Sequence, residues 1–404
     1  MQQTKEASLS SLPLEILEHI FSFLHTDDLL QAMSVCRSWK SLILKSSNLW
    51  RCQKFTFDCT VRPTKRKKVD MMFCVQTFGH HFQMLTVKCR HPFFHACRKM
   101  ADQFNLFLTV LNAPELTLFK VSGLRMECTS KIVIKKMCSK LTQMLATNCH
   151  LKVFEMPAAH WPTQEGQELL DIVFQKSRNT LETLNIAEYF VSLGGLRSEL
   201  DWLSAGLTSL TKLTSLSINI FNLTDDLVVA LAEARRHELA YLSIWANFVL
   251  PIAPHIQQDS WKYLAKACPD MEVELRIVGY VSKAHLSLPA LFESIVLPVG
   301  KLKMIINKTI PPFPWPLKRM EVVLDHIRIH YGPLLKSFKM EIDNRKKENF
   351  DKSLIKLVRD CPRLVHVKVS ASYHSCDTVK TIEKIVTERR QPPLTCNDQH
   401  DKNI

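Results

Sequence analysis

The sequence predicts an α/β protein in which a small helical unit precedes a long array of repeated strand and helix units. Two observations support this prediction. An apolar helix lies almost at the start of the sequence, and short strand-like stretches recur along the rest of the chain, with helical segments between several of them. The 404 residues, of which 46% are hydrophobic and 23% charged, are ample for a large core.

The first element is an amphipathic helix within LPLEILEHIFSFL, residues 12–24. Pro13 fits the first turn of a helix, where its missing N–H costs nothing. Five apolar residues recur at helical spacing and form one stripe: Ile16, Leu17, Ile20, Phe21 and Leu24. Burying these side chains is worth roughly 7–15 kcal/mol, at about 1.5–3 kcal/mol each. The stripe is therefore covered either by the rest of this chain or by another protein.

Further helical elements complete the N-terminal unit, which we place at residues 9–55. His25 to Asp28 break the first helix, and the acidic residues among them favour the start of the next one. We expect this second helix over LLQAMSVCRSWKSLI, residues 29–43, followed by a short element that ends in NLW at 48–50.

A basic linker is predicted at residues 56–70. Its cluster of four positive charges, Lys65 to Lys68, suits a nuclear import signal or a phosphate-binding patch as well as a solvated linker. Residues 61–150 carry 15 basic and 4 acidic residues, whereas residues 1–60 are neutral and residues 151–404 sum to only +3. This local excess indicates an import signal or an acidic partner, such as a substrate that carries an acidic or phosphorylated motif.

The predicted array covers residues 71–390. Alternating stretches of strand type recur in it about every 26 to 33 residues, as in LETLNI at 181–186, LTSLSI at 213–218 and LAYLSI at 239–244. A strand, a turn and a helix repeated at this period are typical of a leucine-rich-repeat solenoid, here with irregular repeat lengths. We expect the polar tail at 391–404 to be disordered.

Two local signals predict where helices of the array begin and end. Thr224 is placed to cap a helix that has two aspartates in its first turn. Cys268 and Cys361 each precede a proline and then a strand-like stretch. Because proline cannot continue a helix, each helix should end at its cysteine.

The thirteen cysteines include no CxxC pair, and several lie in apolar contexts, which favours reduced thiols in the cytoplasm or nucleus. We expect neither a signal peptide nor a membrane span. One cluster combines residue types that zinc prefers: Cys89, His91, His95 and Cys97. Its spacing is not that of the usual zinc fingers, and two phenylalanines lie within it. We therefore predict no metal there.

The N-terminal unit carries a dense sequence pattern, and most of its fixed positions are apolar or aromatic. The positions concerned are Leu12, Pro13, Glu15, Ile16, Ile20, Leu24, Asp28, Leu29, Val35, Cys36, Arg37, Trp39, Leu49 and Trp50. With these residues the unit resembles an F-box over about forty residues. Its place ahead of a repeat array also matches the architecture of that family.

The resemblance implies docking on the Skp adaptor of the SCF (Skp–cullin–F-box) ubiquitin ligase. The adaptor contacts that we predict on this basis are Leu12, Pro13, Ile16, Leu17, Ile20 and Leu30. We expect Val35, Trp39 and Trp50 to hold the unit together. The repeats would bind a protein substrate on their concave face or at its rim. Candidate substrate contacts, which lie just beyond clear strands, are Glu188, Tyr189, Trp245 and Asn247.

Nothing in the sequence indicates catalysis by this chain. It has only nine glycines, no glycine-rich phosphate loop and no GxSxG or HExxH motif. The resemblance implies a non-catalytic receptor subunit without a cofactor, which brings substrates to a cullin-RING ligase for ubiquitination and degradation. Two alternatives stay open: a scaffold tethered by its F-box without a role in degradation, and a nucleic-acid or chromatin-associated protein that uses the basic segment.

Overall fold

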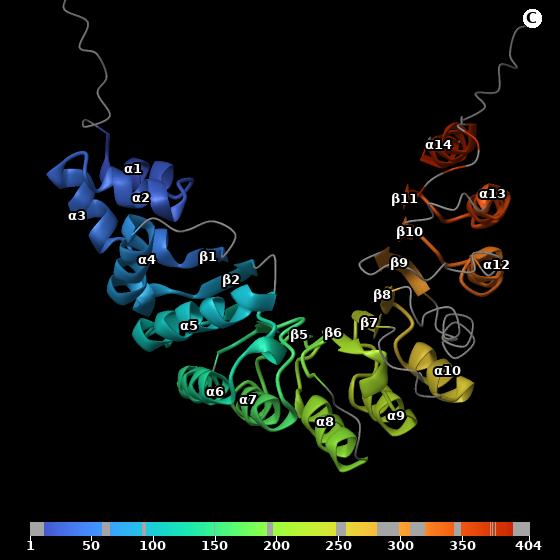
Figure 1. Ribbon diagram of the computed structural model, residues 1–404, viewed down its shortest axis with the longest axis horizontal. Helices are drawn as coiled ribbons and strands as arrows, with labels where there is room; N and C mark the ends of the chain where they lie inside the picture. Colours follow the sequence, from blue (N-terminus) through green and yellow to red (C-terminus); the bar gives the residue numbers. More distant parts are fainter. Residues whose placement is uncertain are drawn as a thin grey trace, which may run out of the picture. The chain divides into compact units, whose positions relative to one another are not determined.

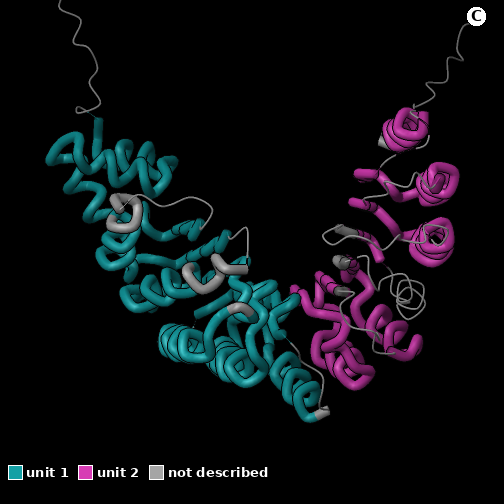
Figure 2. The backbone as a smooth tube through the Cα atoms, viewed as in Figure 1, with its two compact units in different colours: residues 1–214 teal, residues 215–404 magenta. Residues whose placement is uncertain are grey.

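The computed structural model describes residues 12–58, 65–90, 94–148, 150–191, 197–247, 256–280, 299–307, 320–342, 349–371, 373, 375 and 377–390. The chain forms two compact units, residues 1–214 and 215–404, which Figure 2 distinguishes by colour.

Unit 1 begins with a group of short helices that lie together in Figure 1. They are α1 (Leu14–Phe21), α2 (Thr26–Ala32), α3 (Arg37–Lys45) and the 3-10 turn η2 (Asn48–Trp50). The prediction of one helix over 29–43 is wrong, because Cys36 adopts an extended backbone between α2 and α3. Its Sγ accepts a hydrogen bond from the Trp39 amide at 3.5 Å and so caps α3.

The rest of unit 1 alternates strands with helices. Its elements are β1 (Cys52–Asp58), α4 (Lys65–Phe78), η3 (Gly79–His81), β2 (Met84–Arg90), α5 (Phe94–Val110), β3 (Leu118–Ser122), η4 (Met126–Cys128), α6 (Lys131–Ala146), β4 (Val153–Glu155), α7 (Thr163–Lys176), β5 (Thr183–Asn185) and α8 (Arg197–Ser209). Strands β1 to β5 pair in parallel and in chain order. The predicted linker at 56–70 is wrong at both ends, since β1 extends to Asp58 and α4 starts at Lys65.

Unit 2 continues the same alternation. Its elements are β6 (Ser215–Asn219), η5 (Ile220–Asn222), α9 (Asp225–Ala234), β7 (Tyr241–Asn247), α10 (Gln258–Ala267), β8 (Glu272–Tyr280), β9 (Val299–Asn307), α12 (Met320–His330), β10 (Ser337–Ile342), α13 (Asp351–Asp360), β11 (His366–Ser370) and α14 (Asp377–Arg390). Strands β6 to β11 are also parallel and in chain order. The predicted tail at 391–404 lies outside the described residues.

One face of each row of parallel strands forms the core. In unit 1, the register partners Leu85, Phe119, Phe154 and Leu184 of four successive strands are all fully buried. In unit 2, a similar row continues through Ile218, Ile244, Leu275, Leu302 and Phe338, which are at most 1% exposed. Because parallel strands need crossover connections, helices cover this apolar face, while the alternate residues point to the other side.

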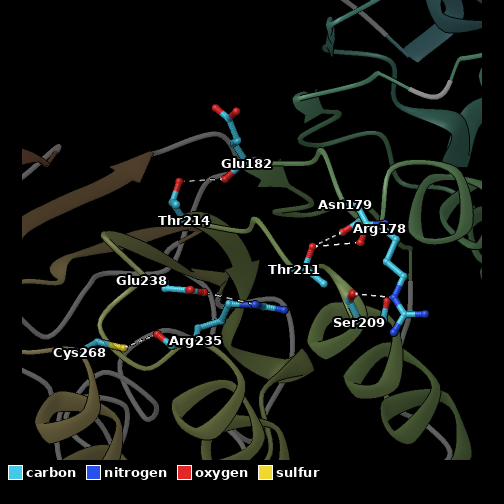
Figure 3. A network of polar contacts seen from close by, with 9 residues as sticks. All are labelled: Arg178, Asn179, Glu182, Ser209, Thr211, Thr214, Arg235, Glu238 and Cys268. Atoms are coloured by element: carbon cyan, nitrogen blue, oxygen red, sulfur yellow. Dashed lines mark hydrogen bonds and ion pairs between the residues drawn. The ribbon is translucent and has the colours of Figure 1, made fainter.

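Hydrogen bonds join several turns to the neighbouring strand–helix repeat, and Figure 3 shows examples. In unit 1, the Thr214 amide and hydroxyl both donate to the Glu182 carbonyl, at 2.9 and 3.2 Å. The Arg178 Nε donates to the Ser209 carbonyl at 3.3 Å. In unit 2, the Cys268 thiol donates to the Arg235 carbonyl at 3.2 Å. Backbone groups at the ends of helices and strands thereby find hydrogen-bond partners in the neighbouring strand–helix repeat of the same compact unit.

The predicted helix boundaries in unit 2 are confirmed. The Thr224 hydroxyl accepts a hydrogen bond from the Leu227 amide at 3.1 Å at the start of α9. Cys268 and Cys361 are the C-cap residues of α10 and α13, and β8 and β11 follow them.

In the described part of the chain, no helix is both long and apolar enough to cross a membrane. The seven cysteines whose side chains are described are free thiols. Burial raises the pKa of Cys74 to about 12, with a smaller contribution from Asp27, and burial raises the pKa of Cys361 to about 11. These thiols are therefore protonated and poor nucleophiles at neutral pH.

Candidate functional site

Helix α1 divides its apolar residues between the interior of unit 1 and the surface. Leu17 and Phe21, four residues apart, are each 2% exposed. The Phe21 ring meets the Trp39 ring of α3 edge to face, with centroids 4.9 Å apart. Ile16 and Ile20, on an adjacent side of the helix, are 47% and 39% exposed. The sequence stripe is therefore two stripes, of which only one is covered in the part of the chain that the structure describes.

Exposed apolar residues are concentrated around α1. Six of the sixteen large hydrophobic residues that are exposed in the described part of the chain lie between residues 14 and 35. Five of these six residues are close together in sequence, and we call them the α1 apolar set: Leu14, Ile16, Ile20, Phe23 and Leu24. Single exposed apolar residues are common on protein surfaces, but this local density is typical of an interaction site.

Polar contacts fix the orientation of α1 on its neighbours. The Glu18 carboxylate accepts hydrogen bonds from the Ser46 hydroxyl at 2.5 Å and from the Asn48 side-chain amide at 3.1 Å. Both partners lie just beyond α3, so this carboxylate joins α1 to the end of that helix. Three members of the α1 apolar set, Leu14, Ile16 and Ile20, are thus presented by a helix that is held at both its apolar and its polar side.

Trp50 joins the short helices to the rest of unit 1. Its side chain is fully buried, and its indole N–H donates to the Ile43 carbonyl of α3 at 2.8 Å. The ring stacks on Phe78 of α4, with centroids 3.7 Å apart and planes at 4°. The Thr26 hydroxyl of α2 donates to the Gln53 side chain of β1 at 2.7 Å. The helices and the first strand therefore share one core.

Residues 9–56 match the family model described as F-box-like. This part of the chain is an F-box-like domain. It contains α1, α2, α3 and η2 and extends into β1. The α1 apolar set and Trp50 both belong to the F-box-like domain, whereas Phe78, on which Trp50 stacks, lies beyond it.

Five of the six predicted adaptor contacts have some surface exposure. Pro13, Ile16 and Ile20 are exposed, and Leu12 and Leu30 are partly exposed. The assignment of Leu17 is wrong, because its side chain is buried inside the domain. Sequence reasoning did not assign Leu14 or Phe23, which are 53% and 74% exposed. Leu14 lies inside LPLEILEHIFSFL, and its place in this apolar stretch was the sequence signal that could have identified it.

The three residues predicted to hold the F-box-like domain together differ in burial. Trp50 is fully buried, and Trp39 is partly buried against Phe21. The assignment of Val35 is wrong, because its side chain is 63% exposed. Val35 follows α2 in a turn, where its amide donates to the Ala32 carbonyl at 3.1 Å, and the break before α3 leaves its side chain outside the core.

The four predicted substrate contacts are divided between the two units. The assignment of Tyr189 is wrong, because it is fully buried and its hydroxyl donates to the Gly166 carbonyl at 3.2 Å. Glu188 is partly exposed in a turn of unit 1, with φ of 53°. Trp245 belongs to β7 of unit 2 and is partly exposed. The side chain of Asn247 lies outside the described residues.

Trp245 belongs to a polar cluster on the side of β7 and β8 that faces away from the core. The Arg276 guanidinium lies 5.0 Å from the Trp245 ring centroid and binds the Glu274 carboxylate through two nitrogens, at 2.7 and 2.9 Å. The Tyr241 hydroxyl also contacts Glu274. Burial raises the pKa of Tyr241 to about 12, and the Glu274 carboxylate adds to this effect. Burial alone would raise the pKa of Glu274, but Arg276 and Tyr241 lower it.

The zinc candidate can be described only in part. Cys89 is buried in β2, while the side chains of His91, His95 and Cys97 lie outside the described residues. Among the described residues, no group of three His, Cys, Asp or Glu side chains could hold a metal ion.

Proposed function

We propose that this chain is the substrate-recognition subunit of an SCF ubiquitin ligase and binds the Skp adaptor through its F-box-like domain. The observation that carries the proposal is the α1 apolar set, which lies exposed on that domain. F-box domains typically bind the Skp adaptor, and through it a cullin-RING ligase. A helix that leaves apolar residues uncovered suits such a contact.

The α1 apolar set can supply a substantial part of the favourable energy of a complex. Its five residues are 36% to 74% exposed, so on average they keep about half of their surface in water. At about 1.5–3 kcal/mol for a fully exposed side chain, covering the set releases roughly 4–8 kcal/mol before the cost of association. Val35, 63% exposed, can add to this surface.

The remainder of the chain suits a leucine-rich-repeat solenoid that binds the substrate. The distance along the chain from the start of one strand to the start of the next ranges from 26 residues, between Ser215 and Tyr241, to 38 residues, between Val299 and Ser337. Each strand is parallel to the next in its unit, and helices connect most of them. We propose that the strand faces away from the helices bind the substrate, and that ubiquitin transfer takes place on other subunits. The receptor would act by raising the local substrate concentration.

The buried thiols of raised pKa support a reducing location, and we propose the cytoplasm, the nucleus or both. An F-box-tethered scaffold without a degradation role would use the same adaptor contact. A nucleic-acid or chromatin-associated function would instead use the +11 segment at 61–150. The side chains of Lys65 to Lys68 lie outside the described residues.

The experiment is co-purification of the full chain with the purified Skp adaptor. We expect a stoichiometric complex that the double variant Ile16→Asp/Ile20→Asp loses. The matched control is Ile132→Asp/Val322→Asp, which introduces the same two charges at residues 70% and 58% exposed on α6 and α12. This control should bind as the unmodified chain does, and circular dichroism should be unchanged in both variants.

The proposal would be contradicted if both double variants lost binding, or if the unmodified chain itself formed no complex with the adaptor. If the chain ignores the adaptor but binds DNA or RNA with a strong salt dependence that maps to 61–150, the nucleic-acid alternative holds.

A further inference from the structure

A row of cationic side chains crosses unit 2 on the side of the strands that faces away from the core. Five register partners lie in line, one from each of β7 to β11. The first is aromatic and the other four are cationic: Trp245, Arg276, Lys303, Lys339 and Lys368. We call the last four residues the cation row. The strands that carry it can be followed in Figure 1.

The side chains of the cation row leave the strands away from the helices. Their sequence neighbours Leu275, Leu302 and Phe338 are at most 1% exposed and belong to the buried row. Since successive side chains of a strand point to opposite faces, the cation row lies on the outer face. Arg276, Lys303 and Lys339 are partly exposed, and Lys368 is exposed.

The spacing of the strands sets the length of this surface. Neighbouring strands lie about 4.8 Å apart, so the four steps from Trp245 to Lys368 cover about 19 Å. A protein segment in extended conformation rises about 3.3 Å per residue, so about six residues cover the same length. Such a segment can place two or three side chains on the cation row.

Carboxylates of the same face neutralise only part of the cation row. Arg276 is bound by Glu274, and Lys339 lies 2.8 Å from the Glu341 carboxylate. Lys303 and Lys368 form no ion pair with any described residue. Partial burial lowers the pKa of Lys303 most, Arg276 and Lys339 lower it further, and the carboxylates of Glu274 and Glu341 offset only part of this effect. An anion beside Lys303 would relieve this repulsion.

A hollow of about 520 Å³ adjoins the cation row at the start of β8 to β11. Lys301 of its lining lies 3.0 Å from the Glu272 carboxylate. Lys336 and Arg363 also line it and form no ion pair with a described residue. The hollow therefore extends the positive surface of unit 2 beyond the strands themselves.

We propose that the cation row and this hollow bind an extended, carboxylate-rich segment of a protein substrate. The inference names the substrate class of the proposed receptor and rests on that proposed function. Two or three Asp or Glu side chains of the segment would lie along Lys303, Lys339 and Lys368, and an apolar or aromatic side chain beside Trp245 would complete the contact.

The distribution of charge favours a protein segment over a nucleic acid. Glu274 and Glu341 lie on the rows that flank the cation row, where they would repel the wide, uniformly charged backbone of a nucleic acid. It also favours carboxylates over a phosphate group. The two cations of the row that form no ion pair with a described residue, Lys303 and Lys368, are separated by the strand that carries Lys339, whereas a single dianionic phosphate is best bound where several donors converge.

The test uses the full chain and a fluorescein-labelled twelve-residue peptide in which glutamates alternate with uncharged residues over six positions. We expect fluorescence anisotropy to give saturable binding that weakens as salt rises. The triple variant Lys303→Glu/Lys339→Glu/Lys368→Glu should weaken binding at least tenfold. The matched control Lys262→Glu/Lys266→Glu/Lys352→Glu makes the same change in charge at exposed residues of α10 and α13 and should leave it unchanged.

Equal binding by the triple variant and the unmodified chain, equal weakening in both variants, or no binding at all would overturn the inference. So would a phosphoserine peptide or an oligonucleotide that binds more than tenfold tighter at the cation row. Adaptor co-purification of the same variants separates this outcome from failure of the proposed function. The triple variant should still bind the adaptor, because its substitutions lie in unit 2.

Discussion

Replacement of Trp50 tests how the F-box-like domain is held to the rest of unit 1. Its indole is fully buried, stacks on Phe78 at 3.7 Å and donates to the Ile43 carbonyl at 2.8 Å. We expect Trp50→Ala to lower the free energy of unfolding of unit 1 by about 3–5 kcal/mol, because a buried aromatic side chain is lost and a cavity replaces it.

Trp50→Phe separates the ring from the hydrogen bond. The phenyl ring keeps most of the apolar contact with Phe78, but the Ile43 carbonyl in the last turn of α3 loses its donor. Leaving a buried carbonyl without a partner costs about 1–3 kcal/mol, so this variant should lie between the unmodified chain and Trp50→Ala. Trp39→Ala, at a partly buried ring, is the comparison and should cost less than Trp50→Ala.

The assay is urea unfolding followed by far-UV circular dichroism, with hydrogen exchange to locate the change. Exchange should accelerate in α3 and in α4 together in Trp50→Ala, because the ring joins these two helices. A loss below 1 kcal/mol, or faster exchange in α3 with α4 unchanged, would refute the role assigned to Trp50.

Two further predictions concern unit 2 and unit 1 in turn. Thr224→Ala should destabilise unit 2 by about 1 kcal/mol, because the hydrogen bond from the Leu227 amide is lost, and Thr224→Ser should restore most of it in the same urea assay. The Glu127 carboxylate lies 2.8 Å from the His160 ring nitrogen Nδ1. Burial alone would raise the pKa of Glu127, but the hydrogen bond and charge of His160 lower it below its ordinary value of 4.5. The stability from this contact is present above pH 4.5 and is lost as the pH falls through the lowered pKa of Glu127. The difference in melting temperature between the unmodified chain and Glu127→Gln should therefore narrow in acid. A difference that stays constant from pH 7 to pH 3 would contradict this prediction.

Features set by local sequence were predicted well. The alternation in LTSLSI and LAYLSI is a direct property of strands, and β6 and β7 lie there. The Thr224 cap and the helix ends at Cys268 and Cys361 depend on a few neighbouring residues and were also correct. Such signals do not require knowledge of the rest of the chain.

Features set by contacts between distant residues were predicted poorly. Ile16 and Leu17 are similar side chains about 100° apart on one helix, and only the packing of α1 in unit 1 decides that Leu17 is covered. Tyr189 was expected at the surface, but its hydroxyl finds a carbonyl 23 residues away. The break at Cys36 interrupts a helical pattern, and the linker prediction followed charge rather than the strand alternation in CQKFTFD.

The cation row was missed for a related reason. Lysines alternate with apolar residues in KLKMI of β9 and FKMEI of β10, which is a legible strand signal. Their common function depends on the pairing register, which includes an irregularity between β8 and β9. Sequence alone fixes neither the register nor the side of the strands that the helices cover.

Adaptor binding by the α1 apolar set is the central claim, and hydrogen exchange of the full chain with and without the purified Skp adaptor tests it most directly. We predict slower amide exchange in residues 14–24 when the adaptor is present, with exchange in β7 to β11 unchanged. Protection confined to 61–150, or an adaptor complex that leaves exchange in 14–24 unchanged, would contradict the claim.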